Sequence, residues 1–166
     1  MDSPTVVLEP FDPARQALLA RWLREPHVSP WYPNPEDHLA WALSPPVGGE
    51  RCMIVSNGEA VGYVRWQVVS RESLDSEGLF EIPDGSVDVD ILIGERGSLA
   101  KGVGPAALEL LVARLAAAPL IGLTTSRYNT IAQRAFHKAG FRFLLEYSPP
   151  PFGECHLMVL RPGETA

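Results

Sequence analysis

Residues 87–112 read VDVDILIGERGSLAKGVGPAALELLV, and this stretch says most about the fold. Apolar and polar side chains alternate through VDVD, which predicts a strand over residues 86–93. Gly102 and Gly104 then precede an apolar-rich run with helical spacing. Glycines allow a tight turn, and the first N–H groups of a helix suit an anion such as a phosphate. The stretch therefore predicts a strand, an anion-binding loop and a helix over residues 103–118.

Two carboxylates lie on one face of the predicted strand. Alternation places Asp88 and Asp90 together with Leu92, and the strand rise separates the two aspartates by roughly 6–7 Å. Two partly buried carboxylates at such a distance raise each other's pKa, which favours a proton-accepting base. The alternative is a half-exposed strand whose aspartates face water. The short connection from Asp90 to Gly102 favours the base, because it places the carboxylate and the anion loop at one end of the sheet.

Two other phosphate-binding folds do not fit the glycine loop. A Walker loop needs Gly-Lys followed by Ser or Thr, whereas residues 101–105 read KGVGP. A Rossmann fingerprint needs its glycines directly after the first strand, a third glycine among them, and an acidic residue that closes the next strand. The sequence has neither pattern, so both folds are excluded.

Periodicity and turn residues predict the remaining elements. The dipeptide Asn57-Gly58 indicates a hairpin, and Gly140 ends a helix. Residues 26–35 and 70–86 are expected to be loops, because the first is rich in proline and the second in acidic residues. The expected strands cover residues 5–10, 52–56, 60–69, 86–93, 120–125, 141–147 and 154–160, and the expected helices cover 14–25, 36–43, 103–118 and 130–138. This order is typical of an α+β protein with a mixed sheet.

Composition limits the classes of function. The 166 residues suit a single domain (1–166), and the net charge of −6 disfavours nucleic acid and anionic membranes while allowing a cationic substrate. No stretch has the length of a membrane span, and the N-terminus has no signal-peptide pattern. Cys52 and Cys155 lack metal-type spacing, so we expect no metal site and a reducing, cytoplasmic location. A monomer and a homodimer are both compatible with the sequence.

Several motifs, taken together, resemble a known family. The stretch 87–112, followed by LTTSRYNTIAQRAFHKAGF (123–141), resembles the GCN5-related N-acetyltransferases (GNAT). LREPHVSPWY (23–32), NGEAVGYVRW (57–66), Asp90 and LAKGVG (99–104) are similar, more narrowly, to the aminoglycoside 6′-N-acetyltransferases of the Ib type, over residues 5–160. The resemblance implies a central mixed, mostly antiparallel sheet, splayed at its middle strands and flanked by about four helices. It also implies acetyl-CoA as co-substrate and a small cationic primary amine, first of all the 6′-amine of an aminoglycoside, as acceptor.

The resemblance also implies roles for individual residues. Asp90 matches the general base. The residues that match cofactor-binding positions are Leu92 and Ile93 on the splayed strand, Lys101, Gly102, Val103 and Gly104 in the pyrophosphate loop, and Asn129 and Arg134 on the following helix. Asn129 alone would also be an adequate helix N-cap. On the acceptor side, we expect Asp88 and a wall of aromatic rings from Trp31, Tyr32, Tyr63 and Trp66. For Tyr63 and Trp66 the alternative is ordinary core packing, and we assign Trp22 and Trp41 to the core outright.

One departure from the family keeps alternatives open. Phe136 stands where the family usually has a tyrosine that acts as general acid. A thiol with a pKa of roughly 8.5 leaves without much help, so an active transferase tolerates the change. A catalytically silent acyl-CoA-binding module is one alternative function. A siderophore-type N-hydroxylysine acyltransferase is another, although no histidine falls within residues 60–69 or 86–93, where that branch has its base.

Overall fold

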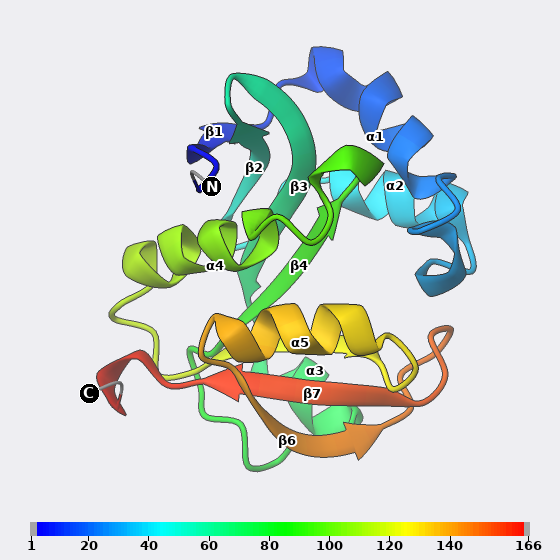
Figure 1. Cartoon of the computed structure of the whole chain (residues 1–166). Helices are drawn as coiled ribbons and strands as arrows, with labels where there is room; N and C mark the ends of the chain where they lie inside the picture. The colour runs from blue at the N-terminus through cyan, green and yellow to red at the C-terminus, as the bar shows by residue number, and fades with distance from the viewer. Residues whose placement is uncertain (1–2, 165–166) are drawn as a thin grey trace.

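The computed structural model describes residues 3–164, and its centre is a seven-stranded sheet (Figure 1). The strand order is β1-β2-β3-β4-β5-β7-β6, and only the β4–β5 pair is parallel. The strands are β1 (Val6–Pro10), β2 (Glu50–Ser56), β3 (Glu59–Val68), β4 (Val87–Ile93), β5 (Ile121–Ser126), β6 (Arg142–Tyr147) and β7 (Cys155–Leu160). The predicted α+β class and the mixed, mostly antiparallel sheet are confirmed.

Strands β4 and β5 separate soon after they pair. The register joins only three residue pairs, the last of which is Val89 with Leu123. Beyond that pair β4 continues for four residues toward Ile93 beside β3, whereas β5 continues beside β7. Figure 1 shows the result as two half-sheets, β1–β4 and β5–β7, that diverge from a shared seam. The splay expected at the middle strands is therefore present.

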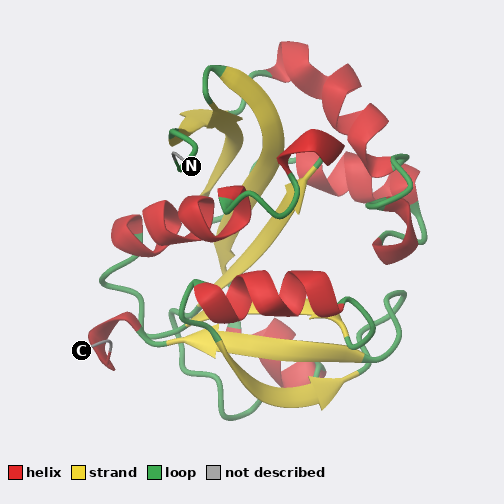
Figure 2. Cartoon of the chain, in the orientation of Figure 1, coloured by secondary structure: helices red, strands yellow, loops and turns green. Residues whose placement is uncertain are grey.

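Helices cover both faces of this sheet (Figure 2). They are α1 (Gln16–Leu23), α2 (Pro35–Leu43), α3 (Arg71–Ser76), α4 (Val103–Arg114) and α5 (Thr130–Lys138). Helices α4 and α5 pack on one face, in a core that includes Val64, Trp66 and Val89. Helices α1 and α2 pack on the other face against Tyr63 and Leu92. Side chains that alternate along β3 and β4 thus belong to two different cores.

The prediction of a loop over residues 70–86 was wrong in its first half, because this segment contains α3. The Ser70 side chain accepts a hydrogen bond from the Ser73 N–H and caps the helix. Leu74 is the one buried residue of the helix, and it packs with Leu79 and Ile82 against residues of β6 and β7. A six-residue helix with one buried side chain has too few apolar positions to show a helical period, so composition alone predicted a loop.

The end of β4 is fixed to α1 by a close contact. The indole N–H of Trp22 donates to the Glu95 carboxylate at 2.8 Å, and Arg21 pairs with the same oxygen. Gly94 lies directly under the Trp22 ring, where a Cβ atom would come within 2.0 Å of the indole. Both groups are backbone or rigid ring, so neither can move aside cheaply. Glycine at this position therefore permits α1 to sit on β4.

We expect Gly94→Ala to lower the free energy of unfolding by about 2–4 kcal/mol, because the added methyl group overlaps a buried indole. Chemical denaturation would measure the change. Gly97→Ala is the matched control, since a Cβ atom there meets nothing within 4 Å, and it should change stability by less than about 0.5 kcal/mol. Equal stability of the two variants would contradict this account of the α1–β4 contact.

Candidate active site

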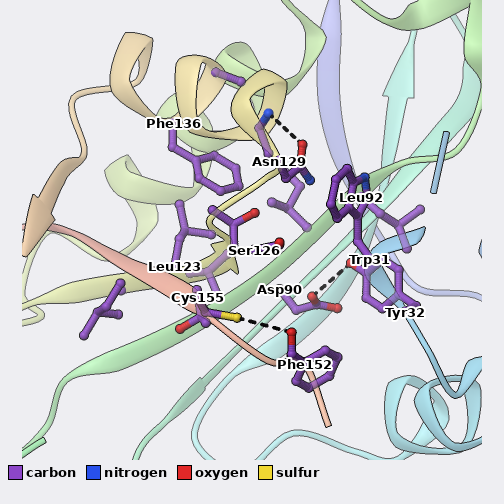
Figure 3. A pocket seen from close by; sticks show the side chains of 18 of the residues that line it. Trp31, Tyr32, Asp90, Leu92, Leu123, Ser126, Asn129, Phe136, Phe152 and Cys155 are labelled. Atoms are coloured by element: carbon purple, nitrogen blue, oxygen red, sulfur yellow. Dashed lines mark hydrogen bonds between the residues drawn. The ribbon is translucent and has the colours of Figure 1, made fainter. Parts of the chain in front are cut away.

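A cavity of about 1660 Å³ lies where β4 and β5 diverge. Its walls come from the α1–α2 connection, from α2, from both diverging strands, and from the starts of α4 and α5. Figure 3 shows Asp90 between the aromatic residues of the α1–α2 connection on one side and the β5–α5 residues Ser126 and Asn129 on the other. The cavity therefore joins the face covered by α1 and α2 to the start of α5.

Asp90 is held by two ring side chains. The Tyr32 hydroxyl donates to Oδ1 at 3.3 Å, and the His38 Nε2 atom lies 3.2 Å from Oδ2. The His38 ring packs between Tyr32, at 4.2 Å between centroids, and Trp41, at 5.2 Å, with both ring pairs tilted. Burial raises the pKa of Tyr32 well above its ordinary value, and the Asp90 charge adds to the rise. Tyr32 is therefore a fixed hydrogen-bond donor that orients the carboxylate.

Asp88 lies on the same face of β4 and also lines the cavity. Burial raises the pKa of Asp88 to about 7, and the nearby Asp90 and Glu77 carboxylates add to the rise. Arg65 and a hydrogen bond from Gln67 oppose the shift only in part. The two aspartates therefore hold fewer than two full negative charges at neutral pH, and a cation that enters the cavity would draw the Asp88 proton off.

A buried arginine lies behind the carboxylates. Arg65 pairs in register with Asp90 on the adjacent strand, and its side chain is 2% exposed. Its guanidinium donates to the Trp41 carbonyl at 2.6 Å and to Gln67 Oε1 at 2.8 Å, and it stacks 4.0 Å from the Trp41 ring. These contacts fix a positive charge below the cavity floor while the carboxylates face the cavity. The cation thus offsets part of the cost of burying two acids.

The glycine loop forms an open helix start. Gly102 precedes α4 with φ +80°, in the left-handed region, and no side chain caps the helix. A Cβ atom at Gly102 or Gly104 would meet nothing within 4 Å, so the first N–H groups of α4 remain accessible. Gly102, Val103 and Gly104 line the cavity, whereas Lys101 is exposed and borders a smaller hollow of about 300 Å³ beside it. Such a start suits a phosphate-type anion.

The other predicted cofactor residues surround the same opening. Leu92 and Ile93 line it from β4, and Asn129 and Arg134 line it from α5. The Asn129 side chain accepts a hydrogen bond from the Ala132 N–H, so it caps α5 as well as facing the cavity. Phe136 is buried beside them, with its ring toward the cavity in Figure 3. The residues expected to contact the donor molecule are thus gathered from two distant parts of the chain.

Two predicted acceptor residues do not reach the site. Tyr63 is fully buried, with its hydroxyl bonded to the Ala42 carbonyl at 2.7 Å, and Trp66 is 4% exposed on the opposite face of β3. The period of two along β3 sends neighbouring positions to different cores, so the two rings cannot share one wall. Trp31 and Tyr32 do line the cavity. Trp41, expected in the core, is only half-buried and lines it too.

His38 is the site residue that sequence reasoning missed. A histidine near the base was expected only on the central strands, whereas His38 reaches Asp90 from α2. A signal was present, because His38 and Trp41 are three residues apart and therefore share one face of a helix.

None of the helices in residues 3–164 has the length and apolar composition of a membrane span. The same residues contain no group of three His, Cys, Asp or Glu side chains that could hold a metal ion.

Comparisons with known proteins agree with this architecture. Residues 14–148 match a family model described as an acetyltransferase (GNAT) domain, and no curated protein matches the chain. Aminoglycoside acetyltransferase AAC(6′)-Ib in complex with coenzyme A is 24% identical, with a TM-score of 0.79 over 96% of each chain. A structure of AAC(6′)-Ib with paromomycin and acetyl-CoA is 25% identical, with a TM-score of 0.76 over 98% of this chain and 95% of that one.

A more distant similarity is to the aminoglycoside N(6′)-acetyltransferase of Legionella pneumophila. It is 18% identical, with a TM-score of 0.77 over 99% of this chain and 95% of that one. At this identity the likeness concerns the fold, which the two chains share over nearly their whole length.

The raised pKa of Asp88 predicts how stability changes with pH. The carboxyl ionises near pH 4 in an unfolded chain and near pH 7 in the folded one, so the folded state binds the proton more tightly. The stability that this proton contributes is present below about pH 4 and is lost as the pH rises through 7. Asp88→Asn removes this loss. The unfolding free energy of the variant minus that of the wild type should therefore be roughly 1–3 kcal/mol larger at pH 8 than at pH 5.

Denaturation curves at the two pH values would measure this difference. Glu109→Gln is the control, because Glu109 is an exposed acid on α4 and its replacement should show little dependence on pH. A gain from Asp88→Asn that is the same at pH 5 and pH 8 would show that Asp88 ionises alike in the folded and unfolded chains.

Proposed function

Because the chain belongs to the GNAT acetyltransferase family and uses acetyl-CoA as its co-substrate, we propose that its acceptor is a primary amine of a small cationic molecule, with the 6′-amine of an aminoglycoside as the first candidate. The observation that carries the proposal is the position of Asp90. Its carboxylate faces the same cavity as the open start of α4, so a proton acceptor and an anion site share one cavity.

The backbone at the start of α4 suits the binding of acetyl-CoA. The accessible N–H groups at Val103 and Gly104 would hold the pyrophosphate, with Lys101 close by and Asn129 and Arg134 along the arm. Bound there, acetyl-CoA supplies an acetyl thioester. Where β4 leaves β5, Leu92 and Ile93 offer a strand edge for the pantetheine arm, and a backbone N–H of this segment would stabilise the developing oxyanion.

The proton chemistry is assigned to Asp90. An alkyl ammonium has a pKa of about 10.4, so at neutral pH the acceptor must lose a proton before its nitrogen can attack. Asp90, directly or through a water, accepts that proton, and Tyr32 holds the carboxylate in place by its hydrogen bond to Oδ1. Phe136 has no proton to give. A leaving thiol with a pKa of roughly 8.5 departs without a dedicated acid, because its thiolate is stable enough near neutral pH.

The acceptor side is acidic and aromatic. Asp88 and Asp90 attract a cation, and the net charge of −6 adds a long-range attraction that salt weakens. Trp31 and Tyr32 offer ring faces on the same side of the cavity for a sugar or an ammonium group. A cytoplasmic location is also proposed, since Cys52 and Cys155 are both free thiols.

The donor site can be tested without an acceptor. We expect Gly104→Val to weaken coenzyme A binding at least about tenfold, or about 1.4 kcal/mol, because the new side chain occupies the approach to the α4 N–H groups. Isothermal titration calorimetry would measure the affinity. Gly163→Val is the control, because that position is equally open and lies outside the cavity. Unchanged affinity in Gly104→Val would remove this loop from the donor site.

The acceptor class and the base can be tested together. A kinetic screen of kanamycin-type aminoglycosides, N-hydroxylysine and free polyamines should give the highest kcat/KM with the aminoglycosides. With the best substrate, Asp90→Asn should lower kcat by about 10²–10⁴-fold while the affinity for coenzyme A is retained. Asp88→Asn should lower kcat by a smaller factor. A preference for N-hydroxylysine would assign the siderophore-type reaction instead. No turnover of any amine would favour a silent acyl-CoA-binding module.

A further inference from the structure

His38 contacts Asp90 but has no part in the chemistry described above. Its side chain is 10% exposed, and its ring is held between Tyr32 and Trp41. The Nε2 atom is 3.2 Å from Asp90 Oδ2, on the carboxylate oxygen that Tyr32 does not contact. A carboxylate accepts hydrogen bonds, so Nε2 carries a proton and Nδ1 is the free basic nitrogen when the imidazole is neutral. Each Asp90 oxygen thus has its own donor.

The groups around the pair differ in what they can titrate. Burial raises the pKa of Tyr63 to about 12 and also raises the pKa of Tyr32 well above its ordinary value, so both hydroxyls stay protonated near neutral pH. Arg65 is a permanent cation bound to the Trp41 carbonyl. Asp37, an exposed acid on α2, and Asp88, with its pKa near 7, also line the cavity, and so does His27 of the α1–α2 connection, whose Nε2 lies 3.0 Å from the Ile93 carbonyl of β4. Histidine is the one further side chain that ordinarily titrates between pH 5 and 8.

The two charge states of His38 have opposite effects on Asp90. A neutral imidazole donates one hydrogen bond and leaves the carboxylate its full charge. When a proton from solvent adds to Nδ1, the contact becomes an ion pair with a charge-assisted hydrogen bond. This pairing lowers the proton affinity of Asp90, and the added positive charge repels a cationic amine. Protonation of His38 therefore weakens both the base and the binding of its substrate.

We propose that His38 is a positioning residue that acts through Asp90: the neutral ring orients the carboxylate, and the protonated ring switches the site off. The proposal rests on the proposed role of Asp90 as the proton acceptor. The proposal predicts that kcat/KM falls toward low pH because His38 of α2 becomes protonated, although His38 does not itself accept the proton of the amine.

The substitution His38→Gln separates the two roles. A glutamine amide can still donate to Asp90, but it does not titrate. We expect the kcat/KM of the variant at high pH to stay within about threefold of the wild type, because the oriented carboxylate is kept. The acid limb should move to lower pH by more than about one unit, toward the range of a carboxylate. The comparison is repeated with Asp88→Asn in both proteins, so that the titration of Asp88 does not hide the shift.

Tyr32→Phe is the matched control. It removes the other hydrogen bond to Asp90 and no group that titrates near neutral pH, so it should lower the rate without moving the acid limb. An unchanged pH profile in His38→Gln would overturn the proposal and leave His38 a purely structural role. Loss of turnover at every pH in His38→Gln would also overturn it, because His38 would then be the base itself.

A second measurement needs no turnover. The imidazole signal that disappears in His38→Gln identifies His38 in an NMR titration, and Asp90→Asn should move its midpoint to lower pH, because the anion that stabilises the imidazolium is gone. A midpoint that does not respond to Asp90→Asn would overturn the proposal even if amines are acetylated. If the midpoint moves but no amine is acetylated, the coupling of the pair stands and the proposed function fails.

Discussion

The parting of β4 from β5 is the constraint on which the rest of the structure depends. Parallel strands can pair only while both backbones run side by side, and here they do so for three residue pairs. Past that point each strand follows its antiparallel neighbour, and the gap leaves backbone groups of β4 without a partner strand. Unpaired backbone groups need another partner. An extended donor molecule can supply one, so the gap is both a cavity and a binding edge.

Electrostatics then give the two ends of the gap opposite character. The end at α4 offers backbone N–H groups and suits an anion. The end beneath α1 and α2 offers Asp88 and Asp90, and it suits a cation. Arg65 lies behind the carboxylates with hydrogen bonds to the Trp41 carbonyl of α2 and to Gln67 of β3, so it lowers the cost of burying them without covering them. An anion and a cation would thereby be drawn to different ends of one cavity.

Local signals in the sequence predicted the strands, the glycine loop and the face of β4 that carries the aspartates, because each depends on neighbours within a few residues. The α2 residues were harder. His38 and Trp41 reach the cavity only because α2 docks on β3 and β4, and docking depends on distant residues such as Tyr63. Tyr63 and Trp66 left the predicted wall for a local reason, because the period of two along β3 places them in different cores. Resemblance to a family implied a role for Asp90, but it could not supply a side chain that the family pattern does not contain.

The two ends of the cavity also differ in what a substitution can change. The donor end is made mostly of backbone atoms, so it needs glycines and a helix start rather than particular side chains. The acceptor end is made of side chains from the α1–α2 connection and α2, and buried polar contacts fix that layer to the sheet: Trp22 to Glu95, Tyr63 to Ala42 and Arg65 to Trp41. Substitutions in that layer can alter the acceptor while the donor end stays intact. The family therefore determines the donor, and under the proposed function the side chains around Asp90 would determine which amine is acetylated.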